Sequence, residues 1–95
     1  MPAYVIVNIE VTDPTPYERY KQMAETAVAA FGGRYLVRGG AAERLEGEWE
    51  PKRVVVLEFP DAVRAKSWWS SAQYAPARAI REASARTDMI LVSGL

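Results

Sequence analysis

The sequence contains no cysteine and no histidine. Without cysteine the chain forms no disulfide bond and has no thiolate for metal binding or nucleophilic attack. Without histidine it lacks the usual zinc ligand, the usual axial ligand of haem and the imidazole of a catalytic triad. We therefore predict no metal site and no bound cofactor, and acid–base chemistry is left to Asp, Glu, Lys or Tyr side chains.

An excess of charge of either sign is also missing, because twelve basic residues are balanced by twelve acidic ones. Binding of nucleic acid draws on a basic surface and binding of lipid surfaces on polybasic segments, so neither partner is expected. No apolar run approaches the roughly 20 residues of a membrane-spanning helix. The first eight residues have the pattern of a strand and lack the basic flank of a signal peptide. We expect a cytoplasmic protein.

The apolar content is sufficient for one small domain. The 95 residues are 49% hydrophobic, which fits a single domain over residues 1–95. A chain of this size buries roughly 60–70% of its unfolded surface, so its core is modest and self-association would enlarge it.

Alternating apolar residues predict a first strand over residues 3–11. One face of this strand is wholly apolar (Ala3, Val5, Val7, Ile9, Val11) and the other is mixed (Tyr4, Ile6, Asn8, Glu10). Further strands are predicted over 34–38, 53–59 and 88–93. In the second, alternation puts Arg34, Leu36 and Arg38 on one face and Tyr35 and Val37 on the other. The continuous apolar run at 54–57 indicates that the third strand is central in its sheet.

Helical patterns occupy two regions between these strands. A capping box of Thr15 and Glu18, with Pro16 at the first helical position, predicts a helix over 16–31 that ends at the glycine pair 32–33. Asp61 is the expected N-cap of a second helical region. A break near 71–75 and a last helix over 76–85 follow from Pro76. The long connection 39–52 is predicted to contain a small hairpin around 45–49.

The resulting order, βαββαβ, predicts an α+β fold of the ferredoxin-like type, with a four-stranded antiparallel sheet and both helical regions on one face. The other face of the sheet is too apolar for an open surface. Its predicted members are Tyr4, Ile6, Leu36, Val54, Val56 and Ile90. A second copy of the same sheet is the simplest cover, so we predict a homodimer that forms an α/β barrel.

Arg38 and Glu58 are charged residues in strands that are otherwise apolar. They are candidates for a ligand site in which Arg38 binds an anion and Glu58 orients a polar group. The alternative is a salt bridge between neighbouring strands, since opposite charges commonly pair in this way. Asn8, on the mixed face of the first strand, needs hydrogen-bond partners and is expected to join a polar cluster with Glu58 or a neighbour.

Aromatic residues are the other candidates. Trp68 and Trp69 are adjacent on one helix and point in different directions, so one belongs to the core and the other to a cavity or an interface. Tyr74 follows in the helix break, and Trp49 lies in the long connection, where binding residues are frequent. Arg78 and Arg81 lie on the last helix and either attract an anion or are simply solvated.

Five segments together are similar to the domain of unknown function 1330 family, a bacterial family of the dimeric α/β-barrel superfamily. They are the segments RYLVRGG (34–40), LEG (45–47), PKR (51–53), EFP (58–60) and WWSSAQY (68–74). The resemblance spans nearly the whole chain, implies a ferredoxin-like subunit that dimerises, and marks Arg38, Glu58 and Tyr74 as positions of interest.

Where relatives usually have Asn, Pro and Glu, this chain has Ser70, Ala72 and Gln73. If that glutamate is catalytic in relatives, Gln73 cannot replace it. Related superfamilies include cofactor-independent monooxygenases and haem enzymes, and the lack of histidine argues against haem.

Three hypotheses follow from the sequence. The first is a homodimer that binds a small organic acid or carbonyl compound between the sheet and the second helical region or inside the barrel. Its site would comprise Asn8, Arg38, Trp49, Glu58, Trp68, Trp69, Tyr74 and Arg78. The second is a cofactor-independent oxygenase or isomerase in which burial raises the pKa of Glu58 and makes it a base. The third is a purely structural dimerisation module.

Overall fold

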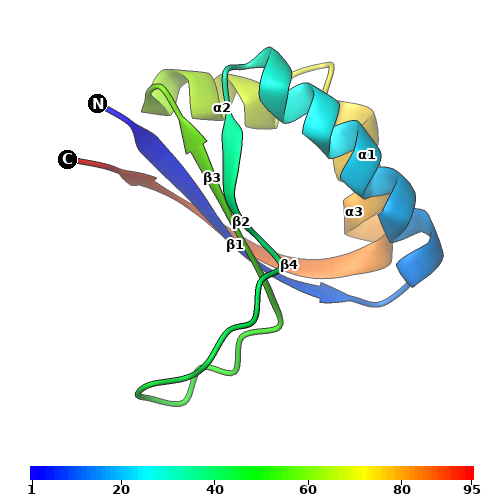
Figure 1. Ribbon diagram of the computed structural model, residues 1–95. Helices are drawn as coiled ribbons and strands as arrows, with labels where there is room; N and C mark the ends of the chain where they lie inside the picture. Colours follow the sequence, from blue (N-terminus) through cyan, green and yellow to red (C-terminus); the bar gives the residue numbers. More distant parts are fainter.

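The chain folds into four strands and three helices, and the computed structural model describes residues 1–95. In chain order they are β1 (Ala3–Val11), α1 (Pro14–Ala30), β2 (Arg34–Arg38), β3 (Arg53–Phe59), α2 (Ala62–Ser70), α3 (Ala75–Ser84) and β4 (Ala85–Ser93). The strands form one sheet in the order β2-β3-β1-β4, and all neighbouring strands are antiparallel. The helices cover one face of this sheet (Figure 1). The predicted ferredoxin-like fold is confirmed, with β3 and β1 at the centre.

The core lies between the helices and the apolar face of the sheet. Strand alternation turns every second residue of β1 and β3 toward the helices, where α1, α2 and the start of α3 supply aromatic and small side chains. The largest fully buried side chains include Trp68, Tyr74, Phe59 and Val28. Burying an apolar side chain of this kind stabilises the fold by roughly 1.5–3 kcal/mol.

The helix α1 begins earlier than the sequence predicted. Asp13 is its N-cap and makes no side-chain hydrogen bond to the helix. Pro14, which lacks an amide hydrogen, therefore suits the first turn, and the predicted capping box of Thr15 and Glu18 is wrong. The end of the helix was predicted correctly: Gly32 follows with φ of +76°, a conformation that glycine adopts without steric cost. Neither this helix nor the shorter ones have the length and apolar character needed to cross a bilayer.

The second helical region is broken as expected. Asp61 caps α2 by accepting a hydrogen bond from the amide of Arg64 at 2.7 Å. At the end of α2, Ser71 has extended backbone, and its Oγ accepts a hydrogen bond from the amide of Tyr74 at 3.0 Å. The helix α3 then starts with Pro76 in its first turn. The strand β4 follows without a loop from Ala85, so the predicted strand over 88–93 was too short.

The predicted hairpin around 45–49 is wrong. Residues 39–52 contain no strand and form a long loop that projects away from the sheet (Figure 1). Leu45 and Trp49 in this loop are 92% and 59% exposed, so no core contact holds the segment in a regular ladder.

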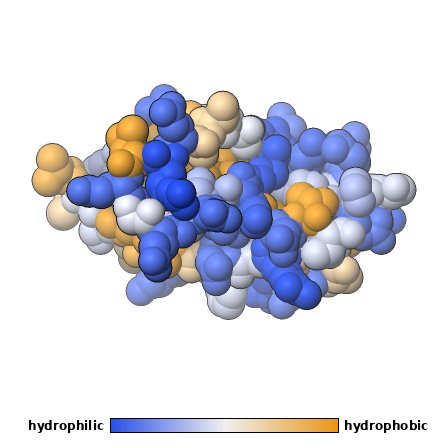
Figure 2. All heavy atoms as spheres, turned by 90° about the horizontal axis from the view of Figure 1, so that it is seen from below, coloured by the Kyte–Doolittle hydropathy of each residue, from blue (hydrophilic) through white to orange (hydrophobic).

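The sheet face opposite the helices carries the apolar row that the sequence predicted. Ile6 on β1 is opposite Val56 on β3 and Ile90 on β4, and Tyr4 is opposite Val92. Ile90 is 57% exposed. Polar residues share this face, including Asn8 and Asp88, and from below the molecule the apolar side chains form separate patches among polar ones (Figure 2).

Candidate functional site

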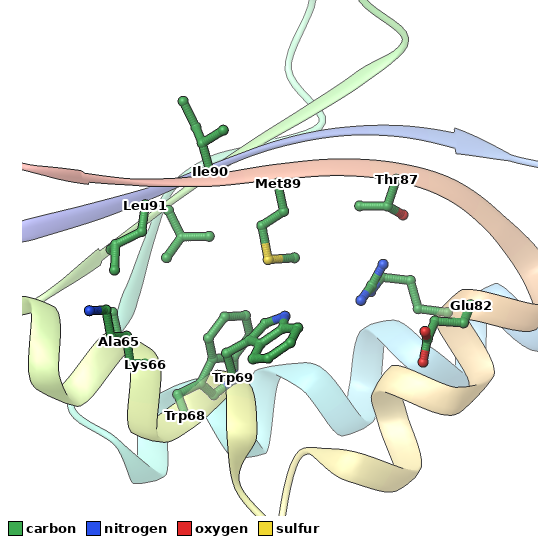
Figure 3. A pocket seen from close by; sticks show the side chains of 11 residues that line it. Ala65, Lys66, Trp68, Trp69, Glu82, Thr87, Met89, Ile90 and Leu91 are labelled. Atoms are coloured by element: carbon green, nitrogen blue, oxygen red, sulfur yellow. The ribbon is translucent and has the colours of Figure 1, made fainter.

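A cavity of about 510 Å³ lies between the helices α2 and α3 and the helix-facing side of β4. Alternation along β4 turns Thr87, Met89 and Leu91 toward the helices and Ile90 to the other side of the sheet (Figure 3). The volume falls in the range of roughly 300–1,000 Å³ that small-molecule sites occupy. Because β4 is an edge strand, no further strand lies beyond it to fill the space.

Apolar side chains form most of the cavity wall. They come from β1, α2 and β4: Val5, Ala65, Trp68, Trp69, Met89 and Leu91. Trp68 is 1% exposed and packs on Phe59 and Tyr74, with ring centroids 5.4 and 4.4 Å apart. Trp69 is 47% exposed. One tryptophan belongs to the core, as the sequence indicated, but both are lining residues of the cavity and not only the second one.

Arg81 is the main polar feature of the cavity. It lies on α3 and is 7% exposed. Its guanidinium forms no salt bridge, and its Nε has no hydrogen-bond partner. Burial of a charge is costly unless the charge is paired and hydrogen-bonded. A cationic side chain in this state is therefore suited to meet an anionic group that enters the cavity.

Two further residues of the cavity lining carry a buried hydrogen-bonding atom that has no partner within the chain. These atoms are the indole Nε1 of Trp68 and the Oγ1 of Thr87. Native proteins satisfy most buried polar groups, so three unpaired atoms around one cavity are unusual. Lys66 and Glu82 are exposed and complete the polar part of the lining.

The tyrosines behind the cavity wall are buried in the core. The hydroxyls of Tyr20 and Tyr74 share a hydrogen bond of 2.9 Å in the core. Burial and the neighbouring hydroxyl of Tyr74 raise the pKa of Tyr20 well above its ordinary value, against a smaller opposing effect of the Arg81 charge. Tyr20 thus stays neutral, and Tyr74 supports Trp68 from behind without lining the cavity.

Arg78 lies beside the cavity and is already engaged. Its guanidinium stacks over the Trp69 ring at 4.8 Å from the centroid, and its Nη1 donates to the Trp69 carbonyl at 3.2 Å. This contact holds the exposed tryptophan of the cavity wall against the start of α3.

Arg38 and Glu58 do not form one site. A bulge in β2 between Tyr35 and Val37 shifts the alternation by one residue. Arg38 is therefore opposite Val55, whose side chain faces the helices, whereas Glu58 lies on the open face. The expectation that Arg38 shares a face with Arg34 was wrong, because regular alternation was assumed across the bulge.

Arg38 is satisfied by neighbours from α1. Its Nη1 donates to Glu25 at 3.2 Å and its Nη2 to the carbonyl of Lys21 at 2.9 Å. The guanidinium also lies 4.3 Å from the centroid of the Tyr35 ring. An anion would have to compete with these contacts, so Arg38 is a weaker anion-binding candidate than Arg81.

Glu58 is paired with another arginine. Arg34 donates from its Nε to Glu58 at 2.7 Å, and this hydrogen bond lowers the pKa of Glu58, with a smaller contribution from the Tyr4 hydroxyl. The same contact with Glu58 raises the pKa of Tyr4. The enzymatic hypothesis requires a raised pKa for Glu58, and the direction of the shift is the opposite.

Asn8 and Trp49 lie away from the cavity. The Oδ1 of Asn8 accepts a hydrogen bond from the amide of Lys52 at 2.8 Å on the open face. The expected polar cluster forms with this neighbour and not with Glu58. Trp49 is in the projecting loop. No group of three or more acidic side chains in the structure is arranged to hold a metal ion.

The sequence model of the family described as "Domain of unknown function (DUF1330)" matches residues 2–95. The chain belongs to this family. The resemblance that the five sequence segments indicated is thereby confirmed. No curated protein matches the chain.

Solved structures place the DUF1330 chain among ferredoxin-like proteins. A protein of unknown function from Rhodopseudomonas palustris, RPA0582, superposes with a TM-score of 0.80 at 17% identity, over 99% of this chain and 82% of that one. A dimeric ferredoxin-like protein of unknown function from Jannaschia sp. CCS1 has a TM-score of 0.66 at 15% identity, over 99% and 100%. SnoaB, a cofactor-independent oxygenase from Streptomyces nogalater, has a TM-score of 0.69 at 12% identity, over 99% and 93%. At these identities the likeness concerns the fold.

Sequence reasoning missed Arg81 and Thr87 of the DUF1330 domain as site residues. For Arg81 the sequence left open whether the residue attracts an anion or is simply solvated. A signal was present, because Ala77, Arg81 and Ser84 follow at i, i+4 and i+7 and share the buried face of α3. An arginine on an apolar stripe indicates either an internal ion pair or a ligand. Thr87 gave no comparable signal, because the predicted strand began one residue later.

Proposed function

We propose that this protein binds a small organic acid in the cavity between α2, α3 and β4. Arg81 carries the proposal, because it is a buried cation without an anionic partner in the chain. An acidic ligand would supply that partner, and the apolar wall would bury the rest of the molecule. Small-ligand sites combine mostly apolar walls with a few polar groups in this way.

The proposal is tested by measuring whether carboxylic acids bind to the protein and whether their binding depends on Arg81. Saturation-transfer NMR is recorded on a mixture of small carboxylic acids and on the matching primary amides, with wild type, Arg81→Gln and Arg19→Gln. Arg19 is an exposed arginine of α1 and serves as the charge-matched control. Acids are expected to bind wild type and Arg19→Gln, and to lose binding in Arg81→Gln. Equal binding to all three proteins, or no binding of any acid, contradicts the proposal.

The proposed assembly is a homodimer that packs the open sheet faces together. Its support is the apolar row formed on the open face by the half-buried Ile6 and Val56 and the exposed Ile90, and two neighbours in fold are described as dimeric. Sedimentation at micromolar concentration is expected to give a dimer mass for wild type and for Val63→Lys on the exposed side of α2. Ile6→Lys is expected to give monomers. A monomer mass for wild type contradicts the assembly.

The enzymatic alternative with Glu58 as a base has less support. Arg34 lowers the pKa of Glu58, and the residue lies on the opposite face of the sheet from the cavity. The structural alternative, a dimerisation module without a ligand, explains the pairs of Arg34 with Glu58 and of Arg38 with Glu25. It offers no reason for a buried, unpaired Arg81.

A further inference from the structure

The unpaired polar groups of the molecule are concentrated in one cavity. Four buried side-chain nitrogen or oxygen atoms have no hydrogen-bond partner within the chain, and three of them belong to residues that line the cavity beside α2, α3 and β4, namely Trp68, Arg81 and Thr87. The fourth is the Nε of Arg53, which lies in a different groove next to α1. This clustering of unpaired polar atoms indicates which hydrogen-bonding groups of the protein a ligand would satisfy.

These groups define the polar part of the ligand. An arginine Nε and an indole Nε1 are donors only, and a threonine hydroxyl is a donor as well as an acceptor. Their complement is a group with two acceptor oxygens and no donor, which a carboxylate provides and a primary amide does not. Arg81 is the only buried cation of the lining, and Glu82 adds a carboxylate nearby. A dianion such as phosphate would leave its second charge without a buried partner, so a single negative charge fits best.

The apolar part of the lining defines the ligand body. Figure 3 shows Met89 pointing from β4 toward the tryptophans of α2, with Leu91 beside it. Indole rings favour stacked or edge-on contacts with other aromatic rings, and a methionine sulfur makes favourable contacts with them. A flat unsaturated ring gains both contacts, whereas a puckered aliphatic ring of the same size gains only apolar burial.

We propose that the cavity takes an aromatic monocarboxylate, with its carboxylate on Arg81 and its ring against the wall formed by Trp68, Trp69 and Met89. This assignment rests on the proposed acid-binding function and adds the class of acid. Trp68 and Thr87 supply further hydrogen bonds to the carboxylate. Lys66 and Glu82, both exposed, flank the bound molecule on the solvent side.

The test follows the indole N–H signals of ¹⁵N-labelled protein during titration with benzoate. The three tryptophans are assigned with Trp49→Phe and Trp69→Phe. Benzamide keeps the ring and removes the charge, cyclohexanecarboxylate keeps the charge and removes the aromatic ring, and inorganic phosphate keeps only an anion. Arg81→Gln and the control Arg19→Gln are titrated in parallel.

Benzoate is expected to saturate the protein and to move the Trp68 indole proton downfield, as a new hydrogen bond would. Cyclohexanecarboxylate is expected to bind about threefold to tenfold more weakly, which is the worth of one aromatic contact. Benzamide and phosphate are expected to be weaker still, and Arg81→Gln to lose benzoate binding while Arg19→Gln retains it.

Each other outcome overturns a defined part of the account. If cyclohexanecarboxylate or phosphate binds as tightly as benzoate and still depends on Arg81, the aromatic assignment is wrong and the acid-binding function stands. If benzoate moves only the signals of Trp49 or Trp69, the carboxylate does not meet Trp68. If no anion binds, or if Arg81→Gln binds benzoate like wild type, both the assignment and the acid-binding function are wrong.

Discussion

The arginines near the two edges of the sheet differ in burial and in pairing. At the β2 edge, Arg34 pairs with Glu58, and Arg38 pairs with Glu25. These guanidinium groups are partly solvated, and protein acceptors satisfy them. At the β4 edge, Arg81 is almost fully buried and has no anionic partner.

The difference distinguishes charged side chains that the protein itself pairs from one that a ligand would pair. Exposed ion pairs contribute little to stability, with a median of about 0–1 kcal/mol, and need no ligand to explain them. A buried cation without a partner lowers the stability of the fold. Destabilising features of this kind are typical of functional sites, where activity and stability oppose each other. This contrast supports the proposal that a ligand binds at the β4 edge.

The largest expected effect concerns the wall of the cavity at the β4 edge. Trp68→Ala removes a fully buried ring that packs on Phe59 and Tyr74, and is expected to lower the free energy of unfolding by about 3–5 kcal/mol. Tyr35→Ala at the β2 edge removes a half-buried ring and is expected to cost about 1–2 kcal/mol. Urea unfolding measures both. A smaller loss for Trp68→Ala than for Tyr35→Ala would contradict the packing described for the wall.

The second prediction compares the two arginines in ligand binding. Arg81→Gln is expected to weaken the binding of an acidic ligand about a hundredfold, or about 2.7 kcal/mol, since a charge-assisted contact in a buried site is lost. Arg38→Gln is expected to leave affinity unchanged because Arg38 faces α1. Calorimetric titration with benzoate measures both constants. A larger loss of affinity for Arg38→Gln than for Arg81→Gln would mean that the binding site lies at the β2 edge.

The third prediction compares the same positions in the free protein. Arg81→Met removes a buried unpaired charge, keeps an apolar stem of similar shape, and is expected to raise the free energy of unfolding by about 1–2 kcal/mol. Arg38→Met breaks an exposed pair and is expected to lower it by at most about 1 kcal/mol. Thermal and urea unfolding without ligand give these values. Strong destabilisation by Arg81→Met would mean that Arg81 is a structural residue.

The smallest expected effect concerns the pH dependence of stability at the β2 edge. Arg34 lowers the pKa of Glu58 in the folded state, so its ionised carboxylate stabilises the fold above the ordinary value of 4.5. That contribution is lost as the pH falls through the lower, folded-state pKa. Glu58→Gln is therefore expected to be less stable than wild type at pH 7, with a difference that shrinks below pH 4.5. Glu43→Gln in the exposed loop is the control, and a difference independent of pH would contradict the pairing.

Strand alternation and helix stops were enough to predict the fold. The apolar faces of β1 and β3, the stop at Gly32 and the break before Pro76 each depend on short-range sequence, and the structure has all three. The α1 start was misread because two prolines are near one another and the second suggested a later start. The hairpin in residues 39–52 was misread because a local apolar pattern was not supported by burial.

The candidate site was less accessible from sequence. Trp68 and Trp69 were identified because two large aromatic residues on one helix must diverge. Arg38 and Glu58 were favoured as site residues, but the structure has them on opposite faces of the sheet. The bulge that causes this leaves no clear mark in the sequence. Arg81 was undervalued because its burial and lack of partner depend on how α3 packs over β4, and both are tertiary facts.

A crystal structure with a bound aromatic carboxylate tests the central claim most directly. The account predicts the carboxylate within about 3 Å of the Arg81 guanidinium, with the indole Nε1 of Trp68 as a second donor. The ring is predicted to lie between the α2 tryptophans and Met89. A ligand bound at Arg38 next to α1, or between open sheet faces beside Glu58, would contradict it.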